Sequence, residues 1–408
     1  MSSKIYLSII ILLFLLSSAA SFSQSNYTIV LSFDAFRWDY PQRGITPNLD
    51  FIAKNGVHAI SLQSCFPSKT FPNHYAIITG MYPENHGLIA NGFTNPATGE
   101  SYTLYDTIPR NDPKWYKGEA IWETAKKQGV KTASYFWPGA TLSIDYRKPD
   151  YTETYVHTRP YAQRISDILK WMELPYNKRP KFINVYFDST DATGHDYGPN
   201  SKEVDYAIAK QDSLIAKLFE GLRKLNLFDS TNVIVLSDHG MTELSPDRVI
   251  NINEVLKGFN FKTQDKGTMM FIYPEKNEED DVYIKLKKSE KNYKVYWKKD
   301  LPDHLHYKNN HFVADIVIIA DLGYSIFDGK DVEKYSKHFP MGNHGYDPYN
   351  IDMHGIFYAI GPDFKSGYTC GTLQNIDIYP LLAKLLGIYP NNNIDGKLER
   401  IEFLLKDK

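Results

Sequence analysis

Strands that end in an acidic residue alternate with helical segments along most of this chain. The apolar run YTIVLSFD at residues 27–34 is the first such strand, and KFINVYFD at 181–188 and NVIVLSD at 232–238 repeat its pattern. The segments between them carry helix-start signals or apolar residues at helical spacing, and the longest covers about residues 201–226. Buried strands separated by helices form mostly parallel sheets with helices on both faces. The sequence therefore predicts an α/β fold with a mostly parallel central sheet flanked by helices.

The remaining elements of this fold follow from the same signals. Residues 46–56, for example, begin with Thr and Pro and end with Gly, an order that is typical of the start and end of a helix. We expect further helices at residues 46–56, 72–80, 118–128, 160–173 and 376–387, and further strands at 57–64, 131–137 and 353–361.

The alternation breaks between about residues 248 and 340. There the stretch NEEDDVYIKLKKSEKNYKVYWKKD alternates apolar and charged residues, which indicates elements with one face in water. The apolar run FVADIVIIA at 312–320 is a strand either of this region or of the main sheet. We interpret residues 248–340 as a small antiparallel or α+β subdomain inserted into a single domain.

The first residues have the order of a secretory signal. Lys4 precedes the apolar run IYLSIIILLFLL, and the small residues SSAAS follow it. The apolar run is about twelve residues long, whereas a membrane span needs about twenty. We expect a signal peptide over residues 1–23, cleaved near residues 20–24, and an exported domain of residues 24–408 without a membrane span, in the periplasm or outside the cell. A retained anchor is the alternative.

Charge and cysteine content exclude two classes of protein. The 46 Lys and Arg residues nearly match the 48 Asp and Glu residues, and the formal net charge of −2 predicts no surface for docking nucleic acid. The two cysteines, Cys65 and Cys370, allow at most one disulfide and no disulfide framework.

Acidic and imidazole side chains gather where the predicted strands end. Ligands of open parallel sheets bind at the carboxyl ends of the strands, so side chains from distant segments can meet there. Three carboxylates and three imidazoles suit a borderline divalent cation such as zinc, and six ligands are enough for two ions. The six candidates are Asp34 in SFDAFRWDY, Asp191 and His195 in the loop DSTDATGHDYG, Asp238 and His239 in SDHGM, and His344 in GNHGYD.

One short stretch, SCFPSKTFPNHY at residues 64–75, offers three candidate nucleophiles. They are the thiol of Cys65 and the hydroxyl groups of Ser68 and Thr70. Thr70 begins a predicted helix, where free backbone N–H groups and the helix dipole favour the negative charge of a phosphate. A bound divalent ion would activate such a hydroxyl group, which is otherwise a poor nucleophile at neutral pH.

Several motifs together resemble the nucleotide pyrophosphatase/phosphodiesterase family of the alkaline phosphatase superfamily. The most specific is KTFPNHYAIITGMYPENHGLIANGF at 69–93, supported by GEAIWETAKKQG, FWPG, DATGHDYGP, SDHGM and GNHGYD. The resemblance extends from SFDAFRWDY to the last predicted helix. It implies an alkaline-phosphatase-like core and two Zn²⁺ ions.

The resemblance also implies a role for each site residue. One zinc would be held by Asp191, His195 and His344, and the other by Asp34, Asp238 and His239. Thr70 would face both ions as the nucleophile and form a phospho-threonine intermediate. Asn91 would donate a hydrogen bond to a phosphate oxygen, and Phe71, Tyr155 and Tyr186 would line a slot for a nucleobase.

Sulfatases of the same superfamily provide the rival interpretation, because CFPSK nearly spells their nucleophile pattern Cys-x-Pro-Ser-Arg. In that pattern the nucleophile lies nine residues before the Thr of a Thr-Gly pair. Counting back from Thr79 reaches Thr70, with Pro72 two residues further on, whereas Cys65 lies five residues too early. The register therefore favours Thr70, and we expect Cys65 to be buried packing.

The expected activity is that of an exported enzyme which hydrolyses nucleotide phosphodiester or phosphoanhydride bonds and releases nucleoside 5′-monophosphate. The substrate would be a small nucleotide or another phosphodiester. The main alternative within the family is a phosphodiesterase for glycerophosphodiesters or choline phospholipids. A sulfatase and a binding protein without activity are further alternatives.

Overall fold

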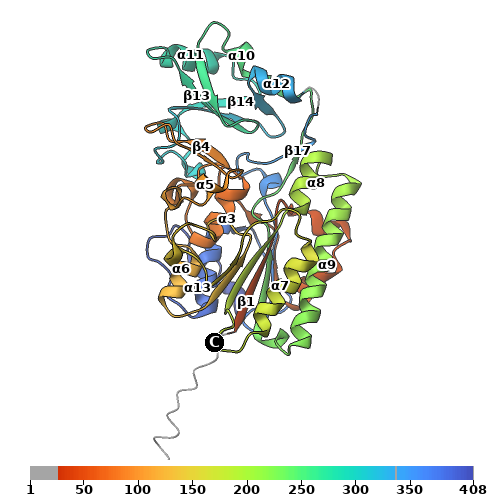
Figure 1. Cartoon of the computed structure of the whole chain (residues 1–408). Helices are drawn as coiled ribbons and strands as arrows, with labels where there is room; N and C mark the ends of the chain where they lie inside the picture. The colour runs from red at the N-terminus through yellow and green to blue at the C-terminus, as the bar shows by residue number, and fades with distance from the viewer. Residues whose placement is uncertain (1–25, 336–337, 408) are drawn as a thin grey trace, which may run out of the picture.

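The computed structural model describes residues 26–335 and 338–407, and its larger part is built on one eight-stranded sheet (Figure 1). All neighbouring strands of this sheet are parallel except β18, which runs antiparallel to both of its neighbours. The prediction of a mostly parallel sheet is confirmed. In spatial order the strands are β19 (Tyr368–Cys370), β2 (Val57–Ala59), β18 (Phe357–Ile360), β9 (Thr231–Leu236), β1 (Tyr27–Phe33), β8 (Phe182–Phe187), β6 (Thr132–Tyr135) and β7 (Tyr151–Glu153).

Strand β1 lies in the centre of the sheet and is buried on both faces, which explains its unbroken apolar sequence. Leu31 and the other odd-numbered residues of the strand pack with one group of helices, and Val30 packs with the other group. The first group is α2 (Pro47–Asn55), α7 (Tyr161–Glu173) and α9 (Lys202–Lys224). The second is α3 (Thr70–Thr79), α6 (Ile121–Lys127) and α13 (Ile378–Leu386).

A smaller α+β part sits beyond one end of the main sheet (Figure 1). Its sheet has four antiparallel strands in the order β12 (Phe261–Gln264), β13 (Met269–Pro274), β15 (Ile316–Ala320) and β14 (Tyr293–Trp297). Helix α11 (Glu279–Lys288) packs on it through Val282 and Leu286, and these side chains belong to a separate apolar core. The predicted α+β subdomain is therefore present, and its limits at residues 248 and 340 stay a prediction.

The remaining elements of the two parts are shorter. The helices are α4 (Pro83–His86), α5 (Thr107–Arg110), α8 (Ser189–Tyr197), α10 (Ile252–Val255) and α12 (Gly329–Tyr335). The two-stranded pairs are β3 (Leu62–Gln63) with β20 (Leu373–Gln374), β4 (Gly92–Thr94) with β5 (Ser101–Thr103), β10 (Thr242–Glu243) with β17 (Gly342–Asn343), and β11 (Val249–Asn251) with β16 (Ser325–Phe327).

Three details of the predicted elements were wrong or incomplete. The strand expected at residues 57–64 is broken into β2 and β3, and β3 pairs outside the main sheet. The strand expected at 312–320 begins only at Ile316 and belongs to the small subdomain. The segment DSTDATGHDYG, expected as a loop, forms helix α8, because packing against α9 outweighs the weak helix propensity of its Gly, Asp and Thr residues.

The predicted signal peptide at residues 1–23 lies outside the described residues. Within residues 26–407, leaving out 336 and 337, no helix is both long and apolar enough to cross a membrane.

Candidate active site

The order of the strands brings five of the six predicted ligands to one edge of the sheet. Strands β8, β1 and β9 are parallel neighbours, so their carboxyl ends lie together. Asp34 directly follows β1, and Asp238 and His239 follow β9. Helix α8 follows β8 and presents Asp191 and His195 four residues apart, on one face.

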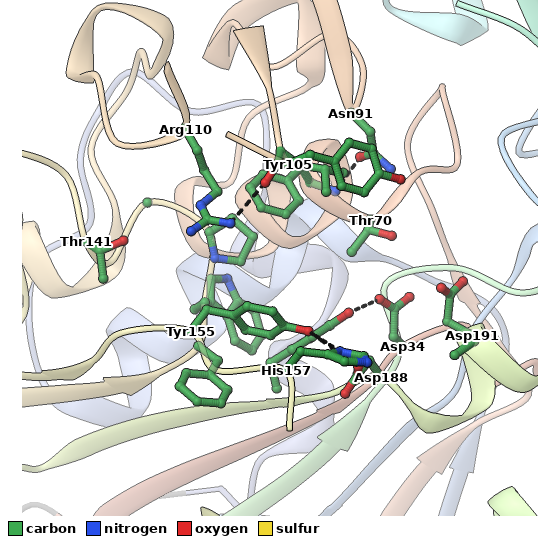
Figure 2. A pocket seen from close by; sticks show the side chains of 18 of the residues that line it. Asp34, Thr70, Asn91, Tyr105, Arg110, Thr141, Tyr155, His157, Asp188 and Asp191 are labelled. Carbon is green, nitrogen blue, oxygen red and sulfur yellow. Dashed lines mark hydrogen bonds and ion pairs between the residues drawn. The ribbon is translucent and has the colours of Figure 1, made fainter. Parts of the chain in front are cut away.

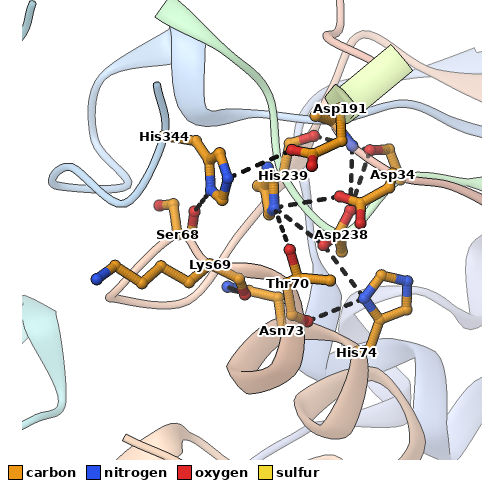
Figure 3. Close-up of polar contacts among 12 residues, drawn as sticks. Asp34, Ser68, Lys69, Thr70, Asn73, His74, Asp191, Asp238, His239 and His344 are labelled. Atoms are coloured by element: carbon orange, nitrogen blue, oxygen red, sulfur yellow. Dashed lines mark hydrogen bonds and ion pairs between the residues drawn. The ribbon is translucent and has the colours of Figure 1, made fainter. Parts of the chain in front are cut away.

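The sixth predicted ligand, His344, comes from a different part of the chain. It directly follows β17, which pairs with β10 beyond the end of β9. Figure 3 shows His344, His239 and Asp191 turned toward one another from three separate segments. The structure thus brings all six predicted side chains together.

The first predicted set of ligands has a close and regular spacing. Asp191 Oδ1 lies 3.4 Å from His195 Nε2 and 3.3 Å from His344 Nε2, and the two imidazole nitrogens are 3.2 Å apart. Ligand atoms about 2.0–2.1 Å from a tetrahedral Zn²⁺ lie about 3.3 Å from one another. The spacing of these three atoms therefore fits one such ion.

The second set meets around His239. Its Nε2 atom lies 3.3 Å from Asp34 Oδ1, 3.1 Å from Asp238 Oδ2 and 3.4 Å from the Thr70 hydroxyl oxygen. The two sets adjoin, because the His239 and His344 rings stack with their centroids 3.7 Å apart. Ligand atoms of Asp191, His239 and His344 also lie within 4.8 Å of one another, so His239 is within reach of both sets.

Backbone carbonyl groups fix the orientation of all three imidazoles. Nδ1 of His195 donates to the Gly342 carbonyl at 2.9 Å, and Nδ1 of His239 donates to the Gly240 carbonyl at 2.9 Å. Nδ1 of His344 donates to the Ser68 carbonyl at 2.7 Å. A carbonyl oxygen only accepts, so Nδ1 carries the proton and Nε2 turns its lone pair to the cluster. Metal-binding histidines are held in this way.

The carboxylates of the cluster repel one another and call for a cation. Asp34 Oδ1, Asp191 Oδ1 and Asp238 Oδ2 are buried atoms without a hydrogen-bond donor among the described residues. Burial raises the pKa of Asp34, and the neighbouring charges of Asp238 and Asp191 raise this pKa further. Burial and the nearby His239 lower the pKa of His344 to about 4. A divalent cation would satisfy the orphaned oxygens and bind the lone pairs of the imidazole Nε2 atoms.

Only one of the three candidate nucleophiles faces this cluster. Cys65 is buried against Asn375, to which its Sγ atom donates at 3.0 Å, and burial raises the pKa of its thiol well above the usual value. The Ser68 hydroxyl is buried and donates to the Tyr346 carbonyl at 3.0 Å. Thr70 is the first residue of α3, and its hydroxyl group points toward the six predicted ligands, which we call the Asp/His cluster (Figure 3). Cys65 is therefore buried packing, as expected, and it forms no disulfide with Cys370.

A cavity of about 330 Å³ opens beside Thr70. Figure 2 shows Asp34, Asp191 and Thr70 at one end of it and Arg110 and Thr141 at the other. Phe71, Tyr155 and Tyr105 are among the aromatic side chains along its walls. Its size and its mix of aromatic walls and a few polar groups are typical of a small-molecule site.

The predicted substrate-binding residues line this cavity in different ways. Asn91 Oδ1 accepts from the Phe71 backbone N–H at 3.0 Å, which leaves the Asn91 amide hydrogens for a ligand. Tyr155 faces the cavity, and its hydroxyl group lies 3.0 Å from His157 Nδ1. Tyr186 has an additional contact, because its hydroxyl group donates to Asp34 Oδ2 at 2.5 Å and so orients a candidate ligand.

Several residues at the site were missed in the sequence. Asp188 closes strand β8 in the same way that Asp34 closes β1, and this pattern could have revealed it. His74 lies in the most specific motif and contacts Asp238 Oδ2 at 3.2 Å from a fully buried position. Tyr105 and Arg110 lie in a segment without strong periodicity, so no sequence signal pointed to them.

Comparison with known proteins identifies the origin of this arrangement. Residues 28–347 match the family described as type I phosphodiesterase / nucleotide pyrophosphatase. The chain belongs to this family. Members of the family are hydrolases of phosphodiester bonds, and the fold is the alkaline-phosphatase-like α/β fold that the motifs implied.

Individual relatives align with nearly the whole phosphodiesterase. The bis(5′-adenosyl)-triphosphatase enpp4 of Xenopus laevis is 35% identical over 389 residues, which cover 95% of this chain and 83% of the relative. Human ectonucleotide pyrophosphatase/phosphodiesterase family member 5 is 34% identical over 393 residues, covering 95% and 80% of the two chains. A solved structure of mouse member 5, an inactive variant in complex with AMP, is 33% identical with a TM-score of 0.87, and the match covers 93% of this chain and 100% of that one.

We predict that removing bound metal lowers the thermal stability of the phosphodiesterase. A chelator would leave the buried carboxylates of Asp34, Asp191 and Asp238 facing one another without a cation. A site filled at about 1,000 times its Kd adds about 4 kcal/mol to the free energy of unfolding. Calorimetry should show a lower melting temperature after EDTA treatment and dialysis, and its recovery on adding Zn²⁺. An unchanged melting temperature in all three samples would contradict the metal assignment.

Proposed function

We propose that the protein is an exported two-zinc phosphodiesterase that cleaves nucleotide phosphodiester or phosphoanhydride bonds and releases nucleoside 5′-monophosphate. The observation that carries the proposal is the convergence of ligand atoms from six side chains beside the Thr70 hydroxyl group at one end of an aromatic cavity. The signal-like order of residues 1–23 supports export.

Two zinc ions fit the donors that meet at this site, because nitrogen and carboxylate ligands at tetrahedral spacing suit Zn²⁺. Asp191, His195 and His344 would hold one ion, and Asp34, Asp238 and His239 the other. When bound, such a pair supplies Lewis-acid stabilisation to phosphoryl oxygens and lowers the pKa of nearby hydroxyl groups. Tyr186 would orient Asp34, through the hydrogen bond of 2.5 Å between them.

Thr70 would take part in two displacements, as the nucleophile in the first and as the leaving group in the second. In the first, its deprotonated oxygen attacks phosphorus, the bond to the leaving oxygen breaks, and a phospho-threonine forms. In the second, water attacks the same phosphorus and releases the phosphoryl product from Thr70. The amide of Asn91 would donate to a phosphate oxygen, and the N-terminus of α3 would favour its negative charge.

The aromatic walls would hold the nucleoside part of the substrate. A base between Phe71 and Tyr155 would gain about 1–3 kcal/mol from stacking. The AMP complex of mouse member 5 and the name of the Xenopus relative support a nucleotide as the substrate. The same aromatic walls could instead receive a quaternary ammonium group. This keeps a glycerophosphodiester or choline-lipid phosphodiesterase as the second candidate.

A panel of four chromogenic esters tests the proposed substrate class. We expect the purified protein to hydrolyse p-nitrophenyl thymidine monophosphate at least tenfold faster, by kcat/KM, than p-nitrophenyl phosphorylcholine. Turnover of p-nitrophenyl phosphate and p-nitrophenyl sulfate should be lower still. A preference for the phosphorylcholine ester would favour the lipid-type alternative, and a preference for the sulfate ester would refute the phosphodiesterase assignment.

We predict that Thr70→Ala lowers kcat by roughly 10³-fold or more, because the variant lacks the hydroxyl group that lies beside the cluster and would form the covalent intermediate. Metal content, measured by elemental analysis, should stay at the wild-type level. Cys65→Ala is the matched control from the same stretch, and it should retain activity within about twofold because Cys65 points away from the cavity. Full activity in Thr70→Ala, or loss of activity in the Cys65 control alone, would move the nucleophile away from Thr70.

We predict that Phe71→Ala raises KM for p-nitrophenyl thymidine monophosphate by about 5- to 150-fold, the equivalent of one lost stacking contact. Its effect on p-nitrophenyl phosphorylcholine should be smaller, because that ester has no base to stack. Phe403→Ala, a partly exposed phenylalanine outside the cavity, is the control. Equal effects of Phe71→Ala on both esters would argue against a base slot.

A further inference from the structure

The side chain of Lys69, directly before the proposed nucleophile, points away from the Asp/His cluster (Figure 3). Its Nζ atom contacts both carboxylate oxygens of Asp265, at 2.6 and 2.5 Å. The two side chains are 10% and 11% exposed, so the ion pair is largely buried. Lys69 is the N-cap residue of α3, and Thr70 is the first residue of this helix. The ion pair therefore holds the chain in place directly before Thr70.

Asp265 belongs to the small α+β subdomain and not to the main sheet. It lies in the turn between β12 and β13, with a φ of +62° that residues other than Gly rarely adopt. The backbone N–H of Lys266 donates to its Oδ1 atom at 2.8 Å, which holds the carboxylate in place. The ion pair therefore connects the subdomain to the residue before Thr70.

A second set of contacts joins the same two regions near His344. Tyr346 packs in the core of the subdomain, and its carbonyl group accepts from the Ser68 hydroxyl at 3.0 Å. Gly345 has a φ of +113°, and a Cβ atom there would lie 2.5 Å from Thr268 Oγ1 and 3.0 Å from Lys69 Cε. The subdomain, the segment of His344 and the segment of Lys69 are thus in direct contact, with no room for a further side chain.

We propose that Lys69 and Asp265 are positioning residues, through which the subdomain sets the place of the Thr70 hydroxyl group relative to the Asp/His cluster. The inference rests on the proposed role of Thr70 as the nucleophile. It gives the subdomain a function in turnover, although its own residues from 248 to 335 contribute none of the six candidate ligands and do not line the cavity. Lys69 does not act as a phosphate ligand, because its charge is paired with Asp265 outside the cavity.

The expected signature is a loss of kcat with little change in KM. A misplacement of about 1 Å at a reacting group can cost about 100-fold in rate. Substrate binding would depend instead on the aromatic walls of the cavity, and neither Lys69 nor Asp265 lines this cavity. We therefore expect Asp265→Asn and Lys69→Met to lower kcat by about 10- to 100-fold and to leave KM within about twofold.

Loss of one partner of a buried ion pair also lowers the stability of the fold. A further variant therefore distinguishes a loss of stability from a misplacement of the Thr70 hydroxyl group. The double variant Lys69→Met/Asp265→Asn removes both charges, so no unpaired charge stays buried. Asn also tolerates the φ of +62° and can still accept from the Lys266 backbone N–H. We expect it to retain the wild-type melting temperature and metal content and still to show the loss of kcat. Lys69→Arg, which can pair with Asp265, should recover most of the rate.

Asp331→Asn is the matched control. Asp331 forms an ion pair with Lys266, the residue that follows Asp265 in the turn, and not with Lys69. All variants are assayed with the best substrate of the four-ester panel, so an error in substrate class does not affect the comparison. Wild-type kcat in the double variant would overturn the proposal. A rise in KM at constant kcat would make Lys69 a substrate ligand instead, and a parallel loss of metal and kcat would reduce the pair to structural support.

Discussion

Mutual repulsion between three carboxylates is the constraint on which the rest of this structure depends. Asp34, Asp191 and Asp238 meet because the parallel strands β1, β8 and β9 are neighbours and each ends in an acid or leads directly to one. Burial and like charge raise the pKa of Asp34, so the fold without a cation contains an unfavourable charge arrangement. Such an arrangement persists only where something else is stabilised by it. In this protein we propose that the binding of divalent cations offsets the repulsion between the carboxylates.

Backbone carbonyl groups orient the three histidines that would bind these ions. Three carbonyl groups select the tautomer of His195, His239 and His344, and two of them belong to segments that carry other parts of the site. The carbonyl group that holds His344 is that of Ser68, two residues before Thr70. A shift of the Thr70 segment would therefore also turn a candidate ligand. This coupling explains why contacts on the far side of that segment, at Lys69, matter for the chemistry.

The sequence predicted which side chains would meet at the end of the sheet better than it predicted the helices and strands from which they project. Strands and acids at their ends are local patterns, and the parallel topology alone brings Asp34, Asp191 and Asp238 together. Helix α8 was not predicted, because its Gly, Asp and Thr residues favour turns and only its packing on α9 makes it helical. The ion pair between Lys69 and Asp265 joins residues 196 positions apart, and no local pattern encodes such a contact. The same holds for Arg110 and Tyr105, which reach the cavity from an irregular segment.

The comparison of Cys65 with Thr70 shows that position relative to the start of α3 identifies the candidate nucleophile better than similarity to a sequence motif does. CFPSK nearly repeats the sulfatase pattern, yet Cys65 lies before the turn that leads into α3 and ends against Asn375. Asn73 holds that turn from inside the helix, since its side chain bonds the backbone of Cys65, Pro67 and Lys69. The turn therefore always delivers the first residue of the helix, and no earlier one, to the cluster. The proposed nucleophile is therefore the residue at the N-terminus of α3, which in this chain is Thr70.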